Sequence, residues 1–235
     1  MAIDNDDARR NNPSDERVAD LDPAPAMAKR VADEKTILRR ILAECRAGLP
    51  ALRATRMSVL VQRNLIESPC YVDAPCIVLY AAKDNEVATD LIFAHGTALG
   101  RRVFYPRIVS GTHHLCLVRV QTLAELQPGE FGILEPTGAE IARDADLERA
   151  LICVPGVAFG PAGQRLGRGG GYYDRLIAAL SPQTVTAGLA YSFQVLDRLP
   201  EAPSDRRLGL IVTESAVRGA AGSFPAVGAR MDSGG

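Results

Sequence analysis

The chain has 235 residues, of which 47% are hydrophobic, 23% are charged and 5% are aromatic, and its formal net charge is −1. A nearly neutral chain without tryptophan lacks the positive field and stacking rings typical of nucleic-acid-binding proteins, so we predict no nucleic-acid partner. The five cysteines contain no Cys-x-x-Cys pair, which argues against a zinc knuckle and against a disulfide framework. No apolar run reaches transmembrane length, and the acidic N-terminus is unlike a secretory signal. We therefore predict a cytoplasmic protein with no membrane contact.

Composition divides the chain into one domain and two tails. Residues 1–30 mix Asp, Arg, Asn, Pro and Ala with few large apolar groups, and residues 219–235 are rich in Gly, Ala and Ser. Segments of this kind bury too little apolar surface to order themselves. We predict flexible tails at 1–30 and 219–235, a single folded domain at 31–218, and a monomer or weak oligomer.

Two helices open the predicted domain. The first begins near Asp33, a favourable N-cap residue, and the second runs from about Thr55 to Glu67. Positions four and seven apart share a helix face, so Lys35, Arg39 and Arg46 border the apolar stripe of the first helix. The stripe of the first helix consists of Ile37, Leu38, Ile41, Leu42 and Cys45, and the inward side of the second consists of Met57, Leu60, Val61 and Leu65.

From residue 76 onward, short apolar runs of strand length alternate with helical segments. The predicted strands are Cys76–Tyr80, Val103–Tyr105 (stopped by Pro106), Leu115–Val120, Leu151–Val154, Val185–Ala190 and Leu208–Val212, and the predicted helices are Val87–Leu99, capped by Gly100, and Tyr172–Leu180. This alternation predicts an α/β fold: a three-layer α/β/α domain with a largely parallel, Rossmann-like sheet. Ligands bind at the carboxyl ends of such strands. There the glycine-rich segment, the Tyr80–Glu86 turn and the Pro106–His114 segment are expected to converge.

The most informative segment is residues 155–174, Pro-Gly-Val-Ala-Phe-Gly-Pro-Ala-Gly-Gln-Arg-Leu-Gly-Arg-Gly-Gly-Gly-Tyr-Tyr-Asp. Glycines let the backbone approach a ligand closely, and successive N–H groups before a helix bind anions. Arg165 and Arg168 add charge suited to phosphate or carboxylate. The segment is neither a Walker A sequence nor a dinucleotide fingerprint. A long flexible turn is the alternative on composition alone, but a simple turn needs no arginine pair, tyrosine pair and aspartate at a helix entry.

Several ordered motifs resemble those of the 5-formyltetrahydrofolate cyclo-ligase family, also called methenyltetrahydrofolate synthetases. Arg165-Leu-Gly-Arg-Gly-Gly-Gly-Tyr-Tyr-Asp174, preceded by Val154-Pro-Gly-Val-Ala-Phe159, is similar to its long glycine-rich motif. The resemblance covers about residues 31–215. It also includes Lys35-Thr-Ile-Leu-Arg39, Asn85-Glu-Val-Ala-Thr89, Gly132-Ile-Leu-Glu-Pro136, Ala187-Gly-Leu-Ala-Tyr191 and Gln194.

The resemblance implies an ATP-dependent cyclo-ligase. Such an enzyme closes the formyl group of 5-formyltetrahydrofolate onto N10 to give 5,10-methenyltetrahydrofolate, with release of ADP and phosphate and with Mg²⁺ assisting. Phosphorylation of the formyl oxygen makes it a good leaving group, so the protein must mainly position two substrates and neutralise phosphate charge.

By the same resemblance, Arg165 and Arg168 are catalytic, Asp174 holds Mg²⁺, and Glu86 binds the donor groups of the pterin. Sequence alone does not decide whether Arg168 stabilises the transferring group or contacts the folate. The implied ATP-binding residues are Lys35, Arg39, Arg165, Leu166, Gly167, Arg168, Gly169, Gly170, Gly171, Tyr172 and Tyr173, and the implied substrate-binding residues are Tyr80, Glu86, Arg168, Gly170 and Tyr172.

Three positions depart from the family pattern, and two other functions stay open. Leu115 stands where the family often has Met, a change that an apolar pocket should tolerate. Ser204 stands where the family usually has His, and Gly209 stands where Asp is common, which puts the C-terminal side of the site in doubt. A folate- or nucleotide-binding regulator without turnover is therefore an alternative. A sugar-phosphate isomerase or a CoA-transferase-like enzyme is a third possibility, which rests on fold likeness alone.

Overall fold

The computed structural model describes residues 23–220. The predicted tail residues 1–22 and 221–235 lie outside this range. The helices are α1 Pro23–Ala47, α2 Ala51–Ile66, α3 Pro69–Val72, α4 Asp90–Ala98, α5 Asp144–Leu147 and α6 Tyr172–Ala178, with 3₁₀ turns at Leu123–Glu125, Glu130–Gly132 and Ser192–Gln194. The strands are β1 Cys76–Val78, β2 Arg102–Ile108, β3 Leu115–Arg119, β4 Leu126–Pro128, β5 Leu134–Pro136, β6 Leu151–Val154, β7 Ala158–Phe159, β8 Arg165–Leu166, β9 Val185–Leu189, β10 Leu210–Val212 and β11 Val217–Gly219.

A seven-stranded sheet forms the middle layer, in the order β11-β10-β9-β6-β1-β2-β3. The five inner strands, β2, β1, β6, β9 and β10, pair in parallel, whereas β3 and β11 are antiparallel edge strands. Numbered along the chain, the inner strands have the doubly wound order 2-1-3-4-5. In that order, the direction of winding reverses between β1 and β6. A ligand crevice is expected outside the carboxyl ends of these two strands.

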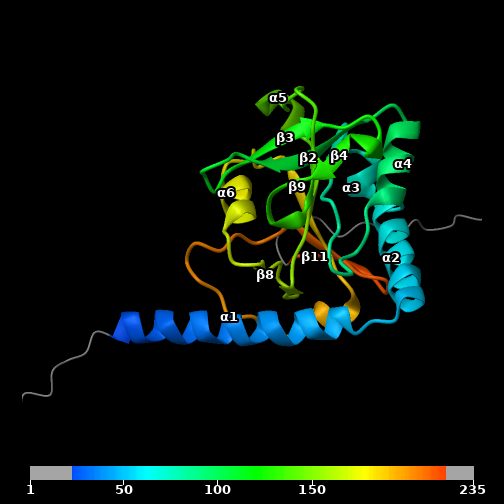
Figure 1. Cartoon of the computed structure of the whole chain (residues 1–235). Coiled ribbons are helices and arrows are strands. Elements are labelled where there is room, and N and C mark those ends of the chain that lie inside the picture. The colour runs from blue at the N-terminus through cyan, green and yellow to red at the C-terminus, as the bar shows by residue number, and fades with distance from the viewer. Residues whose placement is uncertain (1–22, 221–235) are drawn as a thin grey trace, which may run out of the picture.

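Helices cover both faces of the sheet, which confirms the three-layer α/β/α prediction (Figure 1). Alternate strand residues such as Ile77 and Leu151 pack with Val61 and Leu65 of α2 and Ile92 of α4. On the opposite face, the set that includes Val78, Ile152 and Val154 packs against α5 and α6. Buried strands of this kind read as continuous apolar runs because both of their faces are covered.

The first helix differs from its prediction at both its start and its buried face. It begins at Pro23 rather than near Asp33, so residues 23–30 are helical. Leu42 is buried, but Ile37 and Ile41 are 52% and 45% exposed, and Cys45 is exposed too. The inward face instead carries charge, since Lys35 and Arg46 are buried. The apolar stripe was therefore misplaced, because α1 crosses the end of the sheet near β8 and does not cover a face (Figure 1).

Smaller corrections concern individual boundaries. Leu60 of α2 was predicted to point inward but is 45% exposed. Pro106 does not stop β2, which continues to Ile108. Beyond Phe104 this strand pairs only with β3, so the missing N–H of proline can lie on an unpaired side. At the C-terminus, Gly219 belongs to β11 and Ala220 is buried.

Candidate active site

A cavity of about 780 Å³ lies where the doubly wound order predicts a crevice. It lies between the segment after β1 and the glycine-rich segment after β6, and α1 closes one side. Every predicted site residue lines this cavity: Lys35, Arg39, Tyr80, Glu86, Arg165, Leu166, Gly167, Arg168, Gly169, Gly170, Gly171, Tyr172, Tyr173 and Asp174. The structure thus brings together residues that are up to 139 positions apart in the chain (174 − 35).

The glycine-rich segment is built as a hairpin followed by a tight loop. Strands β7 and β8 pair antiparallel, which places Arg165 at the start of the loop. Gly169 and Gly171 have φ values of 108° and 70°, conformations that glycine adopts without the steric cost of a side chain. The helix that follows is only seven residues long and ends before the predicted Leu180. Loop amides and arginines therefore contribute more positive potential here than a helix dipole does.

Arg165 is the most buried cation of the loop, with a side chain that is 4% exposed. Its Nη2 donates to Oδ2 of Asp174 at 3.0 Å, and its Nη1 donates to the Pro155 carbonyl at 3.3 Å. The guanidinium also lies 5.7 Å from the centre of the Tyr173 ring. Its Nε is buried without a partner among the described residues. Such orphaned donors are uncommon in folded proteins.

Arg168 reaches across the cavity to the segment after β1. Its Nη2 and Nε donate to one oxygen of Glu86, Oε1, at 2.9 and 3.3 Å. Its Nη1 donates to Oδ2 of Asp84 at 3.0 Å. The Glu86 side chain is 8% exposed, whereas that of Arg168 is 42% exposed. In this state Arg168 therefore pairs with the carboxylate that was predicted to bind the pterin.

Both basic residues of α1 are attached to the same cavity. Lys35 forms an ion pair with Asp205, and Arg39 Nε donates to the Gly167 carbonyl at 2.8 Å. Leu42, one turn further along, packs with Val157 and Leu166 of the hairpin. The helix face that was predicted to be a basic border is thus the face that meets the glycine loop.

The tyrosines occupy two different environments. Burial raises the pKa of Tyr80 and of Tyr173, so both phenols stay neutral. The hydroxyl of Tyr80 donates to the Val87 carbonyl at 2.8 Å. Tyr172 lies at the cavity mouth, where its ring centre is 5.5 Å from His113 and 6.5 Å from Phe131. Tyr172 is therefore the tyrosine best placed to meet a flat ligand.

Sequence reasoning missed several lining residues. Phe131 is 68% exposed and has a φ of 55°, a left-handed conformation that is unusual for a bulky residue. Its position directly before the Gly132–Pro136 motif was the available signal. Asp205 and the departing Ser204 also line the cavity. Gly209 is not among the lining residues, and its N–H donates to Thr186 Oγ1 at 2.9 Å.

Asp174, the predicted Mg²⁺ ligand, and Asp205 are carboxylates that line the same cavity. Oδ1 of Asp174 accepts the N–H of Arg206 at 3.2 Å, which joins the two acidic segments at one edge of the cavity. Among residues 23–220, no group of three or more His, Cys, Asp or Glu side chains could hold a metal ion by itself. A site of one or two carboxylates fits Mg²⁺, which takes its other ligands from phosphate and water.

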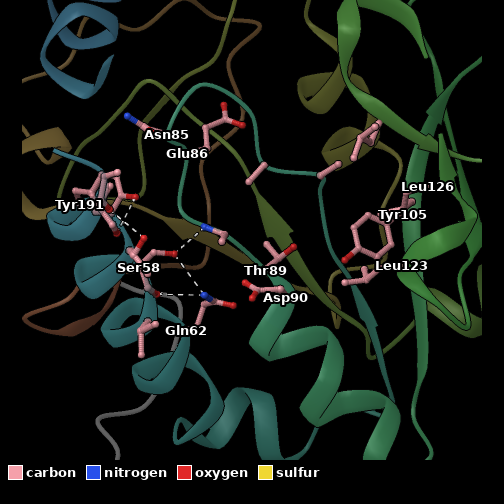
Figure 2. Close-up of a pocket in the computed structure, with 18 residues that line it drawn as sticks. Ser58, Gln62, Asn85, Glu86, Thr89, Asp90, Tyr105, Leu123, Leu126 and Tyr191 are labelled. Carbon is pink, nitrogen blue, oxygen red and sulfur yellow. Dashed lines mark hydrogen bonds between the residues drawn. The ribbon is translucent and has the colours of Figure 1, made fainter. Parts of the chain in front are cut away.

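A second cavity, of about 510 Å³, lies behind the segment after β1 and shares Ala81 and Glu86 with the first (Figure 2). Two side chains from α2 point toward this segment in the figure. Ser58 Oγ accepts the N–H of Ala88 at 2.8 Å, and Gln62 Oε1 accepts the N–H of Leu91 at 2.9 Å. These polar groups are occupied by the backbone, so they anchor the segment that carries Glu86.

Fold and site define the class of the protein. It is a doubly wound α/β protein whose crevice sets a basic glycine loop, suited to phosphate, against a buried carboxylate. Within the described residues, no helix has the length and apolar character needed to cross a bilayer.

Comparison with known proteins identifies the family. The model of the 5-formyltetrahydrofolate cyclo-ligase family matches residues 31–214, and the chain belongs to this family. A 5-formyltetrahydrofolate cyclo-ligase from Haemophilus influenzae is 31% identical over 69% of this chain and 88% of the relative. A probable cyclo-ligase from Caenorhabditis elegans is 28% identical over 78% of this chain and 94% of the relative.

A solved structure agrees with this assignment. The 5,10-methenyltetrahydrofolate synthetase of Aquifex aeolicus is 32% identical, superposes with a TM-score of 0.70, and is matched over 85% of this chain and 99% of its own. The family is one of enzymes, so the comparisons confirm the prediction of a ligase linked to folate.

Proposed function

We propose that the protein converts 5-formyltetrahydrofolate to 5,10-methenyltetrahydrofolate, with ATP hydrolysed to ADP and phosphate. The observation that carries the proposal is that Arg165, the loop Gly167–Gly171 and the carboxylate of Glu86 line one cavity. A phosphate cradle and a recognition group for N–H donors are what a reaction between a nucleotide and a pterin requires.

The chemistry assigned to the site has two steps. The formyl oxygen attacks the γ-phosphorus of ATP, the bond to the β–γ bridging oxygen breaks, and ADP leaves. N10 then attacks the activated formyl carbon and gives up its proton to solvent or to the departing phosphate, and the carbon–oxygen bond breaks with release of phosphate. Neither step needs a covalent bond to the protein. Positioning and charge stabilisation are therefore the work of its residues.

The phosphate groups of ATP are assigned to the glycine loop and the basic face of α1. The amides of the loop and the guanidinium of Arg165 supply fixed donors, which stabilise developing charge without reorganisation. Lys35 and Arg39 reach the same cavity from α1. Because Lys35 is paired with Asp205 and Arg165 with Asp174, bound phosphate would share these cations with the two carboxylates.

The folate is assigned to the side of the cavity that holds Glu86. Pterin amino and ring N–H groups match a carboxylate acceptor, so they would replace Arg168 on Glu86. The released guanidinium would then be free to approach the transferring phosphoryl group. This exchange assigns Arg168 to the transferring group, one of the two roles that sequence reasoning left open. Tyr172 and Phe131 at the mouth would pack on the flat rings.

Mg²⁺ is assigned to Asp174, with Asp205 as the second carboxylate of the same edge. When bound, the ion would neutralise phosphate charge and hold the transferring group in line. Asp174 would keep the hydrogen bonds that it accepts from Arg165 and from the Arg206 amide, and Asp205 the one that it accepts from the Ala202 amide, while both contribute free lone pairs.

An assay with ATP, Mg²⁺ and 5-formyltetrahydrofolate tests the proposal. We expect near-ultraviolet absorbance of the methenyl product, with one ADP released per product formed. Tight folate binding without product would instead favour the non-catalytic regulator. Turnover that proceeds without ATP would favour the isomerase or transferase alternative. A non-hydrolysable ATP analogue is the matched control and should give no product.

A further inference from the structure

Arg46 is a buried cation of the molecule that is absent from the cavity lining. It lies in the last turn of α1, and its side chain is 3% exposed. Burial lowers the pKa of the Arg46 guanidinium below its usual value, while the carboxylate of Glu86 acts in the opposite direction. Arginine stays protonated under such shifts. A charge this deeply buried needs partners that compensate for the water it has lost.

The partners of Arg46 belong to the two segments that flank the cavity. Its Nε donates to the Asp84 carbonyl at 2.8 Å, and its Nη1 donates to the Gly156 carbonyl at 3.4 Å. The same Nη1 lies 3.6 Å from Oε1 of Glu86. One planar side chain therefore ties the segment after β1 to the segment after β6, directly behind the proposed pterin-binding carboxylate.

The backbone before Glu86 makes a left-handed turn, and Arg46 is bonded to it at two points. Asp84 and Asn85 have φ values of 53° and 56°, a left-handed conformation that Asp and Asn adopt more readily than other residues with side chains. The Asp84 carbonyl accepts from Arg46 Nε. The side-chain amide of Asn85 donates to the Arg46 carbonyl at 3.2 Å. These contacts fix the turn that aims Glu86.

Glu86 thus has two cationic neighbours that differ in burial. Arg168 belongs to the glycine loop and is 42% exposed, whereas Arg46 is 3% exposed and is held by backbone carbonyls on both sides. Displacement of Arg168 by a pterin would leave Arg46 as the cation that compensates the buried carboxylate. A group that keeps the acceptor charged and oriented during this exchange acts on folate binding rather than on phosphoryl transfer.

We infer that Arg46 is a positioning residue for Glu86, and that it sets the affinity for the reduced folate without touching either substrate. The inference rests on the proposed function, because it takes Glu86 to be the folate-binding carboxylate. It assigns Arg46 no part in binding the nucleotide.

Kinetics of Arg46→Met and Arg46→Lys test the inference, with Arg40→Met as the matched control. Arg40 lies on the same helix but is exposed. For Arg46→Met we expect KM for 5-formyltetrahydrofolate to rise roughly ten- to one-hundred-fold, as for loss of a hydrogen-bonded charge partner. In every variant, the KM for ATP and kcat should stay within about two-fold of the wild-type values. The reason is that only folate binding is weakened, and by the same amount in the ground state and in the transition state. Lysine keeps the positive charge but lacks the planar guanidinium that donates to several acceptors. Arg46→Lys should therefore retain part of the folate affinity that Arg46→Met loses.

A double-mutant cycle with Glu86→Gln separates positioning from general damage to the fold. In the Glu86→Gln background, Arg46→Met should weaken folate binding by less than about two-fold further, because the charge to be compensated is gone. Equilibrium titration with folate in the absence of ATP gives the same comparison without turnover. If Arg46→Met does not fold, Arg46→Lys and Glu86→Gln complete the cycle.

Three outcomes would overturn the inference: an unchanged folate KM, an equal loss in kcat and in ATP affinity, or an undiminished effect in the Glu86→Gln background. The wild-type protein reports separately on the proposed function. If it neither binds nor converts 5-formyltetrahydrofolate, the proposed function fails. If it does both and Arg46→Met matches Arg40→Met, only the role of Arg46 fails.

Discussion

The two ends of the sheet each carry a buried carboxylate paired with arginines, yet they are built differently. At the amino-terminal end, Asp146 of α5 is 6% exposed and lies 2.7 Å from Nη1 of Arg102 at the start of β2. It also accepts the N–H of Arg143 at 3.0 Å. At the carboxyl-terminal end, Glu86 is 8% exposed but lines a cavity, and one of its arginines belongs to a glycine loop.

The difference shows how the same chemical pair can serve stability or function. Asp146 receives its donors from Arg102 and Arg143, which line neither of the two cavities described above. Glu86 has one deeply buried partner, Arg46, and one partner in the glycine loop, Arg168, which we propose a ligand displaces. Carboxyl ends of parallel strands lead into loops that can vary, whereas the opposite end only has to hold the strands together.

The largest expected effect follows from Arg165→Ala at the carboxyl-terminal end. Loss of one preorganised donor should remove about 2–4 kcal/mol of transition-state stabilisation, which lowers kcat/KM for ATP roughly 30- to 1,000-fold. Steady-state kinetics measures this loss. Arg143→Ala at the other end is the control and should leave kcat/KM unchanged. Wild-type kinetics in Arg165→Ala would remove this residue from the mechanism.

Asp174→Asn should weaken the response to Mg²⁺. Loss of one charged ligand is expected to raise the Mg²⁺ concentration for half-maximal activity by roughly ten-fold or more. A titration of activity against Mg²⁺ at saturating ATP measures the shift. Asp197→Asn, an exposed change, should leave the titration curve in place. An unmoved curve for Asp174→Asn would exclude the aspartate as a metal ligand.

The smallest effect on activity is expected from Asp146→Asn, because the change should fall on stability instead. Hydrogen bonds from Arg143, together with the nearby Arg102, hold the pKa of Asp146 well below its usual range. This carboxylate therefore stabilises the native state above its unfolded pKa of about 4, and the contribution is lost as pH falls further. We expect Asn to lower the free energy of unfolding by about 1–3 kcal/mol at pH 7.

Denaturant unfolding at several pH values tests this difference. The difference in free energy of unfolding between wild type and Asp146→Asn should become smaller as pH falls below about 4. Turnover per folded molecule should not change. Glu140→Gln is a matched control because Glu140 is 54% exposed in its pair with Arg119, and such surface pairs contribute little. A difference in unfolding free energy that does not change with pH would show that the charge of Asp146 is not what stabilises the amino-terminal end of the sheet.

Much of the fold could be predicted because the buried parallel strands leave an unambiguous pattern. Strand β6 coincides with the predicted Leu151–Val154, and Gly100 has the left-handed φ of 70° expected of a helix cap. The short hairpins β4–β5 and β7–β8 were missed, since two- and three-residue strands have no detectable period. Strand β11 was missed as well, and the antiparallel direction of β3 was not foreseen, because it depends on which neighbour the edge strand meets.

The site could be predicted from the sequence to about the same extent as the fold, and the prediction failed in places for a similar reason. The glycine loop, Lys35 and Arg39 line the cavity as expected, because their motifs are local. Phe131 and Asp205 were missed because their side chains act only through neighbours that are distant in the chain. The buried face of α1 was misread, since polar residues such as Lys35 and Arg46 are expected on a solvent face. They are buried here because carboxylates and carbonyls from other segments pair with them.

The sequence by itself determined the α/β class, the strand-loop-helix unit around Gly167–Gly171 and the basic residues that accompany it. These features depend on the conformations of single residues and on short periodic patterns, which a chain encodes locally. Tertiary structure alone decided that Arg168 pairs with Glu86, that Arg46 lies behind it, and that α1 presents charge inward. Such choices depend on the free energy of burying a charge, and that energy is known only when the partners from distant segments are in place.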